Sequence, residues 1–386
     1  MDRCSIQSPD DVGQKRPPAQ STSMPTPAAP HASPEQAIAG LLEQNVIQAG
    51  VAPCAGAAVW LGDHQQGALG FAGGAERSSV FDLASITKTC VALTTALFVQ
   101  AGELDWTTPL AAVLPWLAGT VGGSASIEAH LSHRAGLVSH REFFRAQQAG
   151  VPVDRMAILR AAANARQPSA TLSPLYSDLG YLLVGEALVA LGGQPLDEIV
   201  SSRLTGPRGW AIASARQWRQ QDSAFSSAVP TEIVPARGGL VRGLVHDDNA
   251  WALAGTGLCG HAGLFGTVGG VLGLGRALLD AALGRGDLAQ AAAPLLRRRP
   301  GGSLRLGLDG VTAPGSVAGS VAGPNTFGHL GFTGTSFWCD PDRDAAVCLL
   351  SNRVYPSREN LAIRKARPRV HDGLFSLADR LRNQPD

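Results

Sequence analysis

The sequence has almost no excess charge and no long apolar run, and each shortage argues against a class of protein. Its 32 basic residues nearly balance 31 acidic residues, leaving a net charge of +1. Nothing in that balance favours nucleic acid or an acidic membrane surface as a partner. No apolar run approaches the roughly 20 residues that a membrane-spanning helix needs. We therefore expect no membrane span and no nucleic-acid partner, while the oligomeric state is not indicated.

Cysteine is also scarce, with six residues in 386. They form neither a CxxC pair nor the Cys/His spacing of a zinc site. We expect these thiols to be reduced and mostly buried. An even count would allow disulfides, but the spacing selects no pairing. The residues are Cys4, Cys54, Cys90, Cys259, Cys339 and Cys348.

The first 32 residues are rich in Pro, Ser, Gln and Ala and contain no continuous apolar core of the kind a signal peptide needs. Such a composition buries too little apolar surface to offset the entropy of ordering. We expect a disordered tail over 1–32 and one folded domain over 33–386. The sequence as given indicates a cytoplasmic protein, and a periplasmic one stays open if the start is misassigned.

The folded part begins with a clear helix start. Ser33 can cap a helix, Pro34 suits its first position, and Gln36 completes a capping box. Gly50 marks the expected end of this helix. Alternating or apolar runs predict strands at 55–61, 68–72, 327–332, 336–340 and 345–351, and a closing helix at 358–381.

Strands therefore lie at both ends of the domain, with mostly helical sequence between them. We expect an α+β fold in which strands from about 50–75 and 325–355 form one antiparallel sheet. The terminal helices would cover this sheet. Residues of about 90–295 would form a helical subdomain, and the functional site would lie between the two parts.

One pair of residues has the spacing that nucleophilic catalysis needs. Ser85 and Lys88 are three apart at the start of a predicted helix, so the hydroxyl and the amine can meet on one face. The free N–H groups of a first helical turn favour a developing alkoxide. By itself Ser-x-x-Lys is a weak signal, because an ordinary helix cap with a solvated lysine has the same pattern.

The sequence around this pair resembles the β-lactamase-related serine hydrolase family, which includes class C β-lactamases, penicillin-binding proteins, DD-carboxypeptidases and family VIII esterases. Residues 81–88 read FDLASITK where members typically have FDLASxTK, and 127–137 read IEAHLSHRAGL, similar to TxRHLLTHTSGL. A Tyr-x-Asp at 176–178 and a His-x-Gly at 329–331 follow in the family's order. The resemblance covers about residues 35–380 and implies a β-lactamase/transpeptidase-like fold.

The resemblance also implies roles for individual residues. Ser85 would be the nucleophile, Lys88 and Tyr176 its bases, and His329 a source of hydrogen bonds or positive charge beside the cleft. The backbone N–H groups of Ser85 and Phe332 would form the oxyanion hole. No cofactor and no metal is implied.

Further residues are expected to contact the substrate. Gly331 would leave room for the substrate to lie along its strand. Asn352 and Arg353 follow the last strand and could contact a substrate carboxylate. Asp178 and Phe332 complete this set.

Two of these positions depart from the family pattern. Asp178 stands where members most often have asparagine, and a carboxylate beside Lys88 would keep the lysine protonated unless Asp178 is neutral or paired elsewhere. His329 stands where lysine is commoner, so positive charge is reduced near neutral pH. Both departures point away from an efficient β-lactamase and towards an esterase or a peptidase-like hydrolase.

Two histidine-containing motifs resemble a branch of the family. Residues 242–250 read RGLVHDDNA and 260–265 read GHAGLF, and we expect both to shape the floor of the site. His246, Asp247 and His261 could hold a metal, but structural hydrogen bonding is the favoured interpretation.

The sequence therefore predicts a serine hydrolase that forms an acyl-enzyme on Ser85 and cleaves an ester or amide in a small-molecule or peptidoglycan-like substrate. The alternative is a catalytically weak relative that binds muropeptide or β-lactam for signalling or scaffolding. An α/β-hydrolase is disfavoured, because the sequence has no Gly-x-Ser-x-Gly elbow.

Overall fold

The computed structural model describes residues 32–148, 150–168, 174–312 and 315–383. Residues 1–31 of the predicted tail and Cys4 lie outside the described residues. The predicted helix start is confirmed: the Ser33 side chain accepts from Gln36 N, and the Gln36 side chain accepts from Ser33 N. The division into a tail and a single domain over 33–386 stays a prediction.

The main sheet has six antiparallel strands in the order β2-β1-β11-β10-β9-β8. Strand β1 from the start of the domain pairs with β11 from its end, with Ala55 opposite Ser351. The predicted sheet, assembled from both ends of the chain, is therefore confirmed, and the short strand β8 extends it beyond the residues that were predicted. The strands are β1 (Ala55–Leu61), β2 (Gln66–Ala72), β8 (Asp309–Gly310), β9 (Phe327–Leu330), β10 (Ser336–Asp340) and β11 (Ala345–Ser351).

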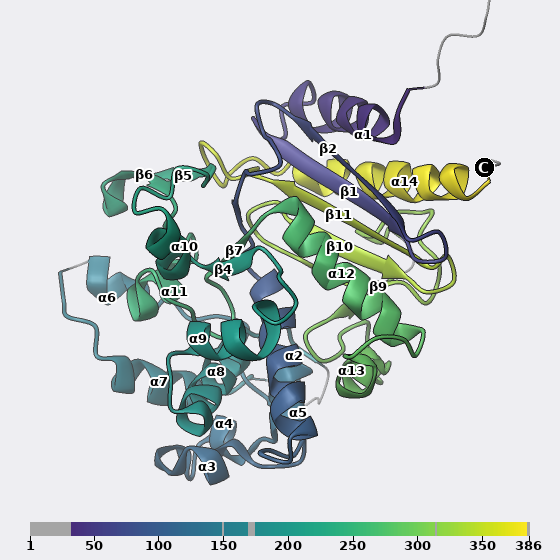
Figure 1. Cartoon of the computed structure of the whole chain (residues 1–386). Helices are drawn as coiled ribbons and strands as arrows, with labels where there is room; N and C mark the ends of the chain where they lie inside the picture. Colours follow the sequence, from purple (N-terminus) through teal and green to yellow (C-terminus); the bar gives the residue numbers. More distant parts are fainter. Residues whose placement is uncertain (1–31, 149, 169–173, 313–314, 384–386) are drawn as a thin grey trace, which may run out of the picture. The chain divides into compact units, whose positions relative to one another are not determined.

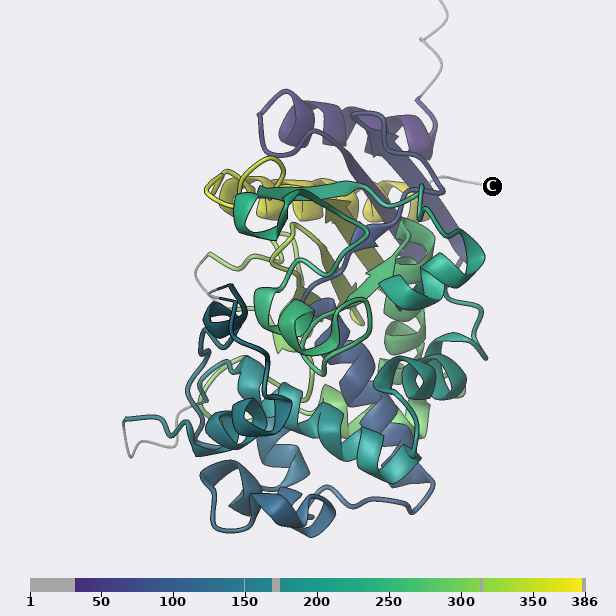
Figure 2. The ribbon, with the colours of Figure 1, turned by 90° about the vertical axis from the view of Figure 1, so that its left-hand side faces the viewer.

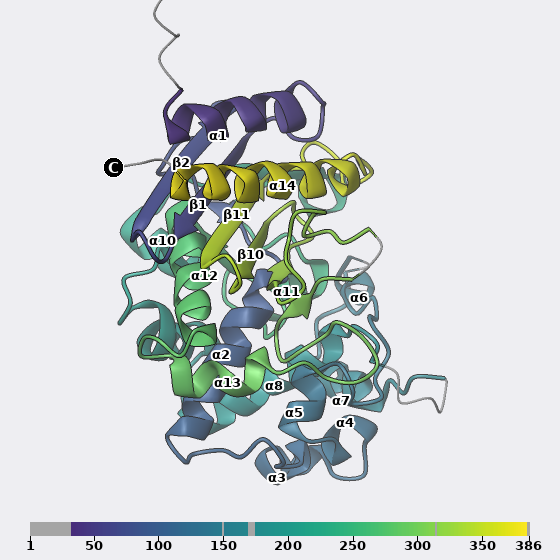
Figure 3. The same ribbon diagram turned by 90° about the vertical axis from the view of Figure 1, so that its right-hand side faces the viewer.

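Helices cover both faces of this sheet. Figure 3 shows α1 (Pro34–Leu42) and α14 (Ile363–Arg382) on one face, with α12 (Val268–Ala282) and α2 (Ile86–Gln100) on the other. The period of two along a strand explains this division. In β11, for example, Val347 and Leu349 pack toward the terminal helices, whereas Ala346, Cys348 and Leu350 belong to the core on the opposite face.

The middle of the chain is mostly helical, as predicted, and Figures 1 and 2 show its helices gathered away from α1. Its α-helices are α3 (Leu110–Val113), α4 (Val121–Ser124), α5 (Ile127–Leu131), α6 (Phe144–Gln148), α7 (Arg155–Asn164), α8 (Asp178–Gly192), α9 (Leu196–Val200), α10 (Ala215–Gln221), α11 (Asp248–Ala254) and α13 (Ala289–Leu296). Short π or 3₁₀ turns occur at Glu43–Ile47, Pro115–Leu117, Ser201–Thr205 and Pro235–Arg237.

The sequence prediction missed two small sheets outside the main sheet. Strands β3 (Phe81–Asp82), β7 (Leu264–Gly266) and β4 (Ile212–Ser214) form one, and β5 (Pro230–Val234) pairs with β6 (Gly239–Arg242) in the other. Segments of two to five residues are too short to show a period of two. The first of these sheets leads directly into the site, because β3 precedes α2.

Three further expectations can be compared with the structure. The strand predicted to reach Phe332 ends at Leu330, and the closing helix predicted over 358–381 spans Ile363–Arg382. The five described cysteines are buried and free, as predicted. Among the described residues no single helix is long and apolar enough to span a membrane, although α8 and the segment Leu196–Thr205 pass that test together, bent by 78°.

Candidate active site

A tight turn presents Ser85 at the start of α2. Ala84, just before it, has a φ of +45°, which a residue with a side chain rarely adopts. Hydrogen bonds hold this backbone: Ala84 N donates to Asp82 Oδ1 over 2.8 Å, and Thr333 Oγ1 donates to Asp82 O over 2.6 Å. The Asp82 carboxylate thus fixes the turn that carries the predicted nucleophile.

Lys88 lies one helical turn further on, and its side chain is completely buried. Its Nζ atom is 2.9 Å from Ser85 Oγ, 2.8 Å from Asp178 Oδ1 and 3.3 Å from His261 O. These three acceptors match the three N–H donors of an ammonium group. The predicted meeting of Ser85 and Lys88 on one helix face is therefore present in the structure, although the catalytic roles of both residues stay predictions.

Lys88 and Asp178 form an ion pair. Burial lowers the pKa of Lys88, but the nearby charge of Asp178 outweighs it and raises that pKa above its ordinary value. Burial raises the pKa of Asp178, but the charge of Lys88 and the contact with His140 bring it well below its ordinary value. The sequence left open whether Asp178 is neutral, paired elsewhere or paired with Lys88. The structure favours a charged Asp178 that is paired with Lys88.

Tyr176 lies beside this pair. Its ring stacks on the His133 ring with centroids 4.5 Å apart, and Lys88 Nζ is 4.9 Å from its ring centroid. Burial raises the pKa of the Tyr176 phenol, and the charge of Lys88 offsets this only in part. The resting site consequently holds a neutral phenol beside an ammonium group.

His329 lies on β9, and its ring centroid is 6.1 Å from that of Tyr176. Its Nδ1–H donates to Leu330 O over 2.8 Å. Burial and then the charge of Lys88 lower the pKa of His329 to about 3. The His329 ring is therefore neutral near pH 7. Of the two predicted roles, hydrogen bonding remains and positive charge does not.

Ser85 opens onto a cleft of about 490 Å³. Of the predicted residues, Ser85, Tyr176, Asp178, Gly331 and Phe332 line it. The other lining residues are Ala84, His140, Glu142, Phe144, His246, Asp247, Asp248, Ala262, Leu330, Arg358 and Arg367. The N–H groups of Ser85 and Phe332 donate to no other described residue, so both are free for the predicted oxyanion hole.

Asn352 and Arg353 do not line this cleft, contrary to expectation. Asn352 accepts from Cys54 N and donates to Pro230 O. Arg353 donates to the carbonyl oxygens of Phe332, Arg358 and Asn360. The polar atoms of both side chains are used to join backbone segments, which explains why they follow the last strand without reaching the cleft.

Arg367 is a cleft residue that the sequence did not single out. Its Nη2 atom donates to Gly331 O over 2.5 Å and to Thr335 O over 3.1 Å. Its Nε atom is buried without a partner, and no carboxylate of the described residues pairs with it. Burial and then the charge of Arg353 lower its pKa to about 9. In sequence it is one of several arginines near the start of α14, with no spacing that marks it.

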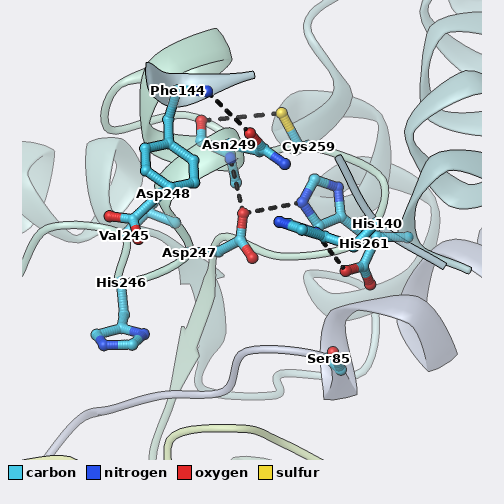
Figure 4. A network of polar contacts seen from close by, with 12 residues as sticks. Ser85, His140, Phe144, Val245, His246, Asp247, Asp248, Asn249, Cys259 and His261 are labelled. Carbon is cyan, nitrogen blue, oxygen red and sulfur yellow. Dashed lines mark hydrogen bonds and ion pairs between the residues drawn. The ribbon is translucent and has the colours of Figure 1, made fainter. Parts of the chain in front are cut away.

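Both histidine-containing motifs supply residues that line the cleft, among them His246, Asp247 and Ala262. His246 Nε2 is 2.8 Å from Glu232 Oε2. Figure 4 shows the contact between His261 and Asp247, in which His261 Nε2 is 3.0 Å from Asp247 Oδ1. Asp247 Oδ1 also accepts from Ala250 N and so caps α11. In the described part of the chain no three His, Cys, Asp or Glu side chains are arranged to hold a metal ion.

Gly331 has a packing role besides the room that it was expected to leave for substrate. A Cβ atom there would lie 2.0 Å from Thr335 Oγ1 and 2.5 Å from Leu83 O. Both distances are far below van der Waals contact. Glycine is therefore needed because this segment lies directly against the turn that precedes Ser85.

Gly331→Ala is expected to push the 331–335 segment away from this turn. Overpacking of this kind costs about 1–3 kcal/mol of stability, and displacement of Ser85 should lower ester turnover more than tenfold. Thermal unfolding and steady-state kinetics measure the two effects. Gly40→Ala is the matched control, since Gly40 lies in α1 with no atom within 4 Å of the added methyl group. Equal behaviour of the two variants would contradict the packing argument.

Comparison with known proteins identifies the family. The model of the family described as Beta-lactamase matches residues 42–370. The chain therefore belongs to the beta-lactamase family. The resemblance seen in the sequence motifs is confirmed.

Curated relatives match over part of their length. A protein of Escherichia coli O157:H7 named "Putative D-alanyl-D-alanine carboxypeptidase" is 29% identical over 198 residues, which are 47% of this chain and 45% of that protein. A protein of the same name from Salmonella gallinarum is 28% identical over 218 residues, covering 52% and 48%. The chain thus spans about half the length of the curated relatives it matches.

Solved structures share the fold. A mutant of the simvastatin synthase LovD from Aspergillus terreus has a TM-score of 0.67 at 15% identity, covering 91% of this chain and 100% of that one. A class C beta lactamase from Rhodobacter sphaeroides has a TM-score of 0.64 at 18% identity, covering 88% and 98%. The predicted β-lactamase-like α+β fold is confirmed.

Proposed function

We propose that the chain hydrolyses small acyl esters through an acyl-enzyme on Ser85, and that it cleaves D-alanyl-D-alanine-type amides more slowly. The observation that carries this proposal is the 2.9 Å contact between Ser85 Oγ and Lys88 Nζ, beside a cleft of about 490 Å³. A hydroxyl in contact with a buried amine is the arrangement that nucleophilic acyl transfer needs.

In the first half-reaction Ser85 Oγ attacks the acyl carbon while the neutral form of Lys88 takes the hydroxyl proton. The N–H groups of Ser85 and Phe332 stabilise the oxyanion, and the alcohol leaves with the proton returned by Lys88. In the second half-reaction water gives a proton to Lys88 and attacks the acyl carbon of the Ser85 ester. The bond between that carbon and Ser85 Oγ then breaks, the acid leaves, and Lys88 returns the proton to Ser85 Oγ. The neutral phenol of Tyr176, stacked on His133, is available as a further proton donor and acceptor.

The contact between Asp178 and Lys88 favours esters over amides. Asp178 Oδ1 lies 2.8 Å from Lys88 Nζ and raises the pKa of the lysine, so its base form is scarce. The leaving group of an ester needs less protonation than that of an amide. A weakened base therefore slows amide cleavage more than ester cleavage.

Arg367 supports a substrate that carries an anionic group. Its guanidinium lines the cleft and contacts Gly331 O, yet it pairs with no carboxylate of the described residues. A buried cation without a counter-ion is costly, and a substrate carboxylate would relieve that cost with charge-assisted hydrogen bonds. The relatives named as D-alanyl-D-alanine carboxypeptidases fit such a substrate, because that dipeptide ends in a free carboxylate.

The matched pair N-acetyl-D-alanyl-D-lactate and N-acetyl-D-alanyl-D-alanine tests this function, because the two differ only in the ester oxygen or amide N–H. We expect the wild-type protein to cleave the ester faster. Asp178→Asn removes the charge and keeps the shape, so kcat/KM for both substrates should rise by up to about tenfold for each unit by which the pKa of Lys88 falls, and the amide-to-ester ratio of kcat/KM should rise as well. Liquid chromatography of the released lactate or alanine measures both rates.

An unchanged ratio in Asp178→Asn would mean that Asp178 is only a structural partner of Lys88. Failure to cleave either substrate, together with failure to cleave simple p-nitrophenyl esters, would favour the alternative of a non-catalytic protein that binds muropeptide or β-lactam. That alternative is the less favoured one, because Ser85, Lys88 and Tyr176 lie together beside the cleft.

A further inference from the structure

His140 extends the contacts of Ser85 and Lys88 to the surface of the cleft. Its Nδ1 atom is 3.4 Å from Asp178 Oδ2, while Asp178 Oδ1 is 2.8 Å from Lys88 Nζ. The His140 side chain is 40% exposed, the Asp178 side chain 20% and the Lys88 side chain 0%. Asp178 thus lies between a buried cation and a titratable group that can exchange protons with solvent.

The segment that carries His140 is held against α8 by its backbone. Asp178 N donates to Ser139 O over 2.9 Å, and Ser177 Oγ donates to Val138 O over 2.7 Å. These bonds fix the residue before His140 to the first turn of the helix that presents Asp178. The 3.4 Å contact therefore belongs to a tethered arrangement, and such contacts often shorten when a substrate binds.

Acidic groups face His140 from three directions. They are Asp178 on α8, Asp247 at the start of α11 and Glu142 on its own segment. Asp247 is paired with His261, and Glu142 with Arg145, which leaves the Asp178 contact as the strongest of the three. This contact raises the pKa of His140 and outweighs the opposing effect of burial. His140 therefore keeps its proton to a higher pH than a free imidazole does.

We propose that His140, as imidazolium, replaces Lys88 as the cation paired with Asp178, so that Lys88 can be neutral when it activates Ser85. The inference rests on the proposed function. In the exchange, one N–H bond of Lys88 breaks and its proton goes to water, while His140 Nε2 takes a proton from water. Asp178 remains a carboxylate, and the net charge of the three groups does not change.

This exchange removes a difficulty in the mechanism. The ion pair with Asp178 keeps Lys88 protonated, and deprotonation alone would leave the partly buried carboxylate without a cation. With His140 charged, Asp178 keeps a partner throughout. Lys88 can then cycle between neutral and charged forms in both half-reactions. His140 touches neither Ser85 nor the reacting atoms in this account, and it acts through Asp178.

The proposal predicts an unusual pH dependence. Above the pKa of His140 and below that of Lys88, the three groups share one exchangeable proton between His140 and Lys88. The fraction with the proton on His140 is then independent of pH, so the acylation rate should be flat. His140→Gln can keep a hydrogen bond to Asp178 but cannot carry charge, so its rate should rise about tenfold per pH unit over the same range.

The experiment measures single-turnover acylation by a p-nitrophenyl ester from pH 5 to pH 10, in five proteins. These are the wild type, His140→Gln, Asp178→Asn, the double variant and the control His64→Gln, which changes a histidine in the β1–β2 turn. We expect a flat region in the wild type and the control only, and no further effect of His140→Gln once Asp178 is replaced. Parallel profiles for wild type and His140→Gln would overturn the proposal.

A second readout separates this proposal from the proposed function. NMR titration of the His140 imidazole needs no turnover, and Asp178→Asn should lower the pKa of His140 because a neighbouring negative charge is lost. An unchanged pKa would overturn the exchange even in an active enzyme. Absence of acylation in the wild type would instead overturn the proposed function, and with it the role assigned to His140.

Discussion

Replacing Ser85 by alanine lowers turnover of esters by a factor on the order of 10⁴ or more, which is the scale on which loss of a nucleophile acts in serine hydrolases. The folded protein should hardly change, because Lys88 keeps its contacts with Asp178 and His261 O. Steady-state kinetics and thermal unfolding of the same preparation measure the two quantities.

The matched control for this variant is Ser78→Ala. Ser78 is exposed and precedes β3, and its hydroxyl donates a hydrogen bond to Glu76. Ser78→Ala should keep turnover within about twofold of the wild-type value. It should also change stability by about 0.5 kcal/mol or less, as most surface substitutions do. Residual turnover in Ser85→Ala within tenfold of the wild type would mean that another group performs the attack.

Replacing Lys88 by methionine should lose both activity and stability. The base is gone, so acylation should fall by a factor on the order of 10³ or more. The Asp178 carboxylate is left without the cation 2.8 Å away, and removal of one partner of a buried pair costs about 3–5 kcal/mol. The lower end is expected here because Asp178 is 20% exposed and keeps its contact with His140. Urea unfolding measures this free energy.

The double variant Lys88→Met/Asp178→Asn separates the two effects. Removing the carboxylate that has lost its buried partner should restore much of the stability and none of the acylation. Lys365→Met on α14 is the control for replacing a lysine. Recovery of activity in the double variant, or equal stability of all three proteins, would contradict the roles given to the pair.

Much of the fold could be predicted because it rests on local patterns. Strands β1, β10 and β11 have the bounds expected from the sequence, since their alternating residues face two different cores. The start of α1 follows from the capping box at Ser33 and Gln36. The contact between Ser85 and Lys88 could be predicted because residues three apart share a helix face and because the surrounding motifs resemble those of the family.

The rest of the site depends on contacts between residues far apart in the chain. Asp178 reaches Lys88 across 90 positions and His140 across 38, and no period in the sequence records either contact. Arg367 could not be distinguished from neighbouring arginines. It differs from them in lining the cleft without a carboxylate partner among the described residues, and the sequence does not record that difference. Asn352 and Arg353 were misplaced for the opposite reason, since the backbone carbonyls they contact have no signature in the sequence.

The most direct test of the account is the mass of the protein after rapid mixing with a p-nitrophenyl ester and acid quenching, followed by peptide mapping. The account predicts one added acyl group, carried by the peptide that contains Ser85, and no added mass in Ser85→Ala. An acyl group on another residue, or ester cleavage by Ser85→Ala at the wild-type rate without any adduct, would contradict it.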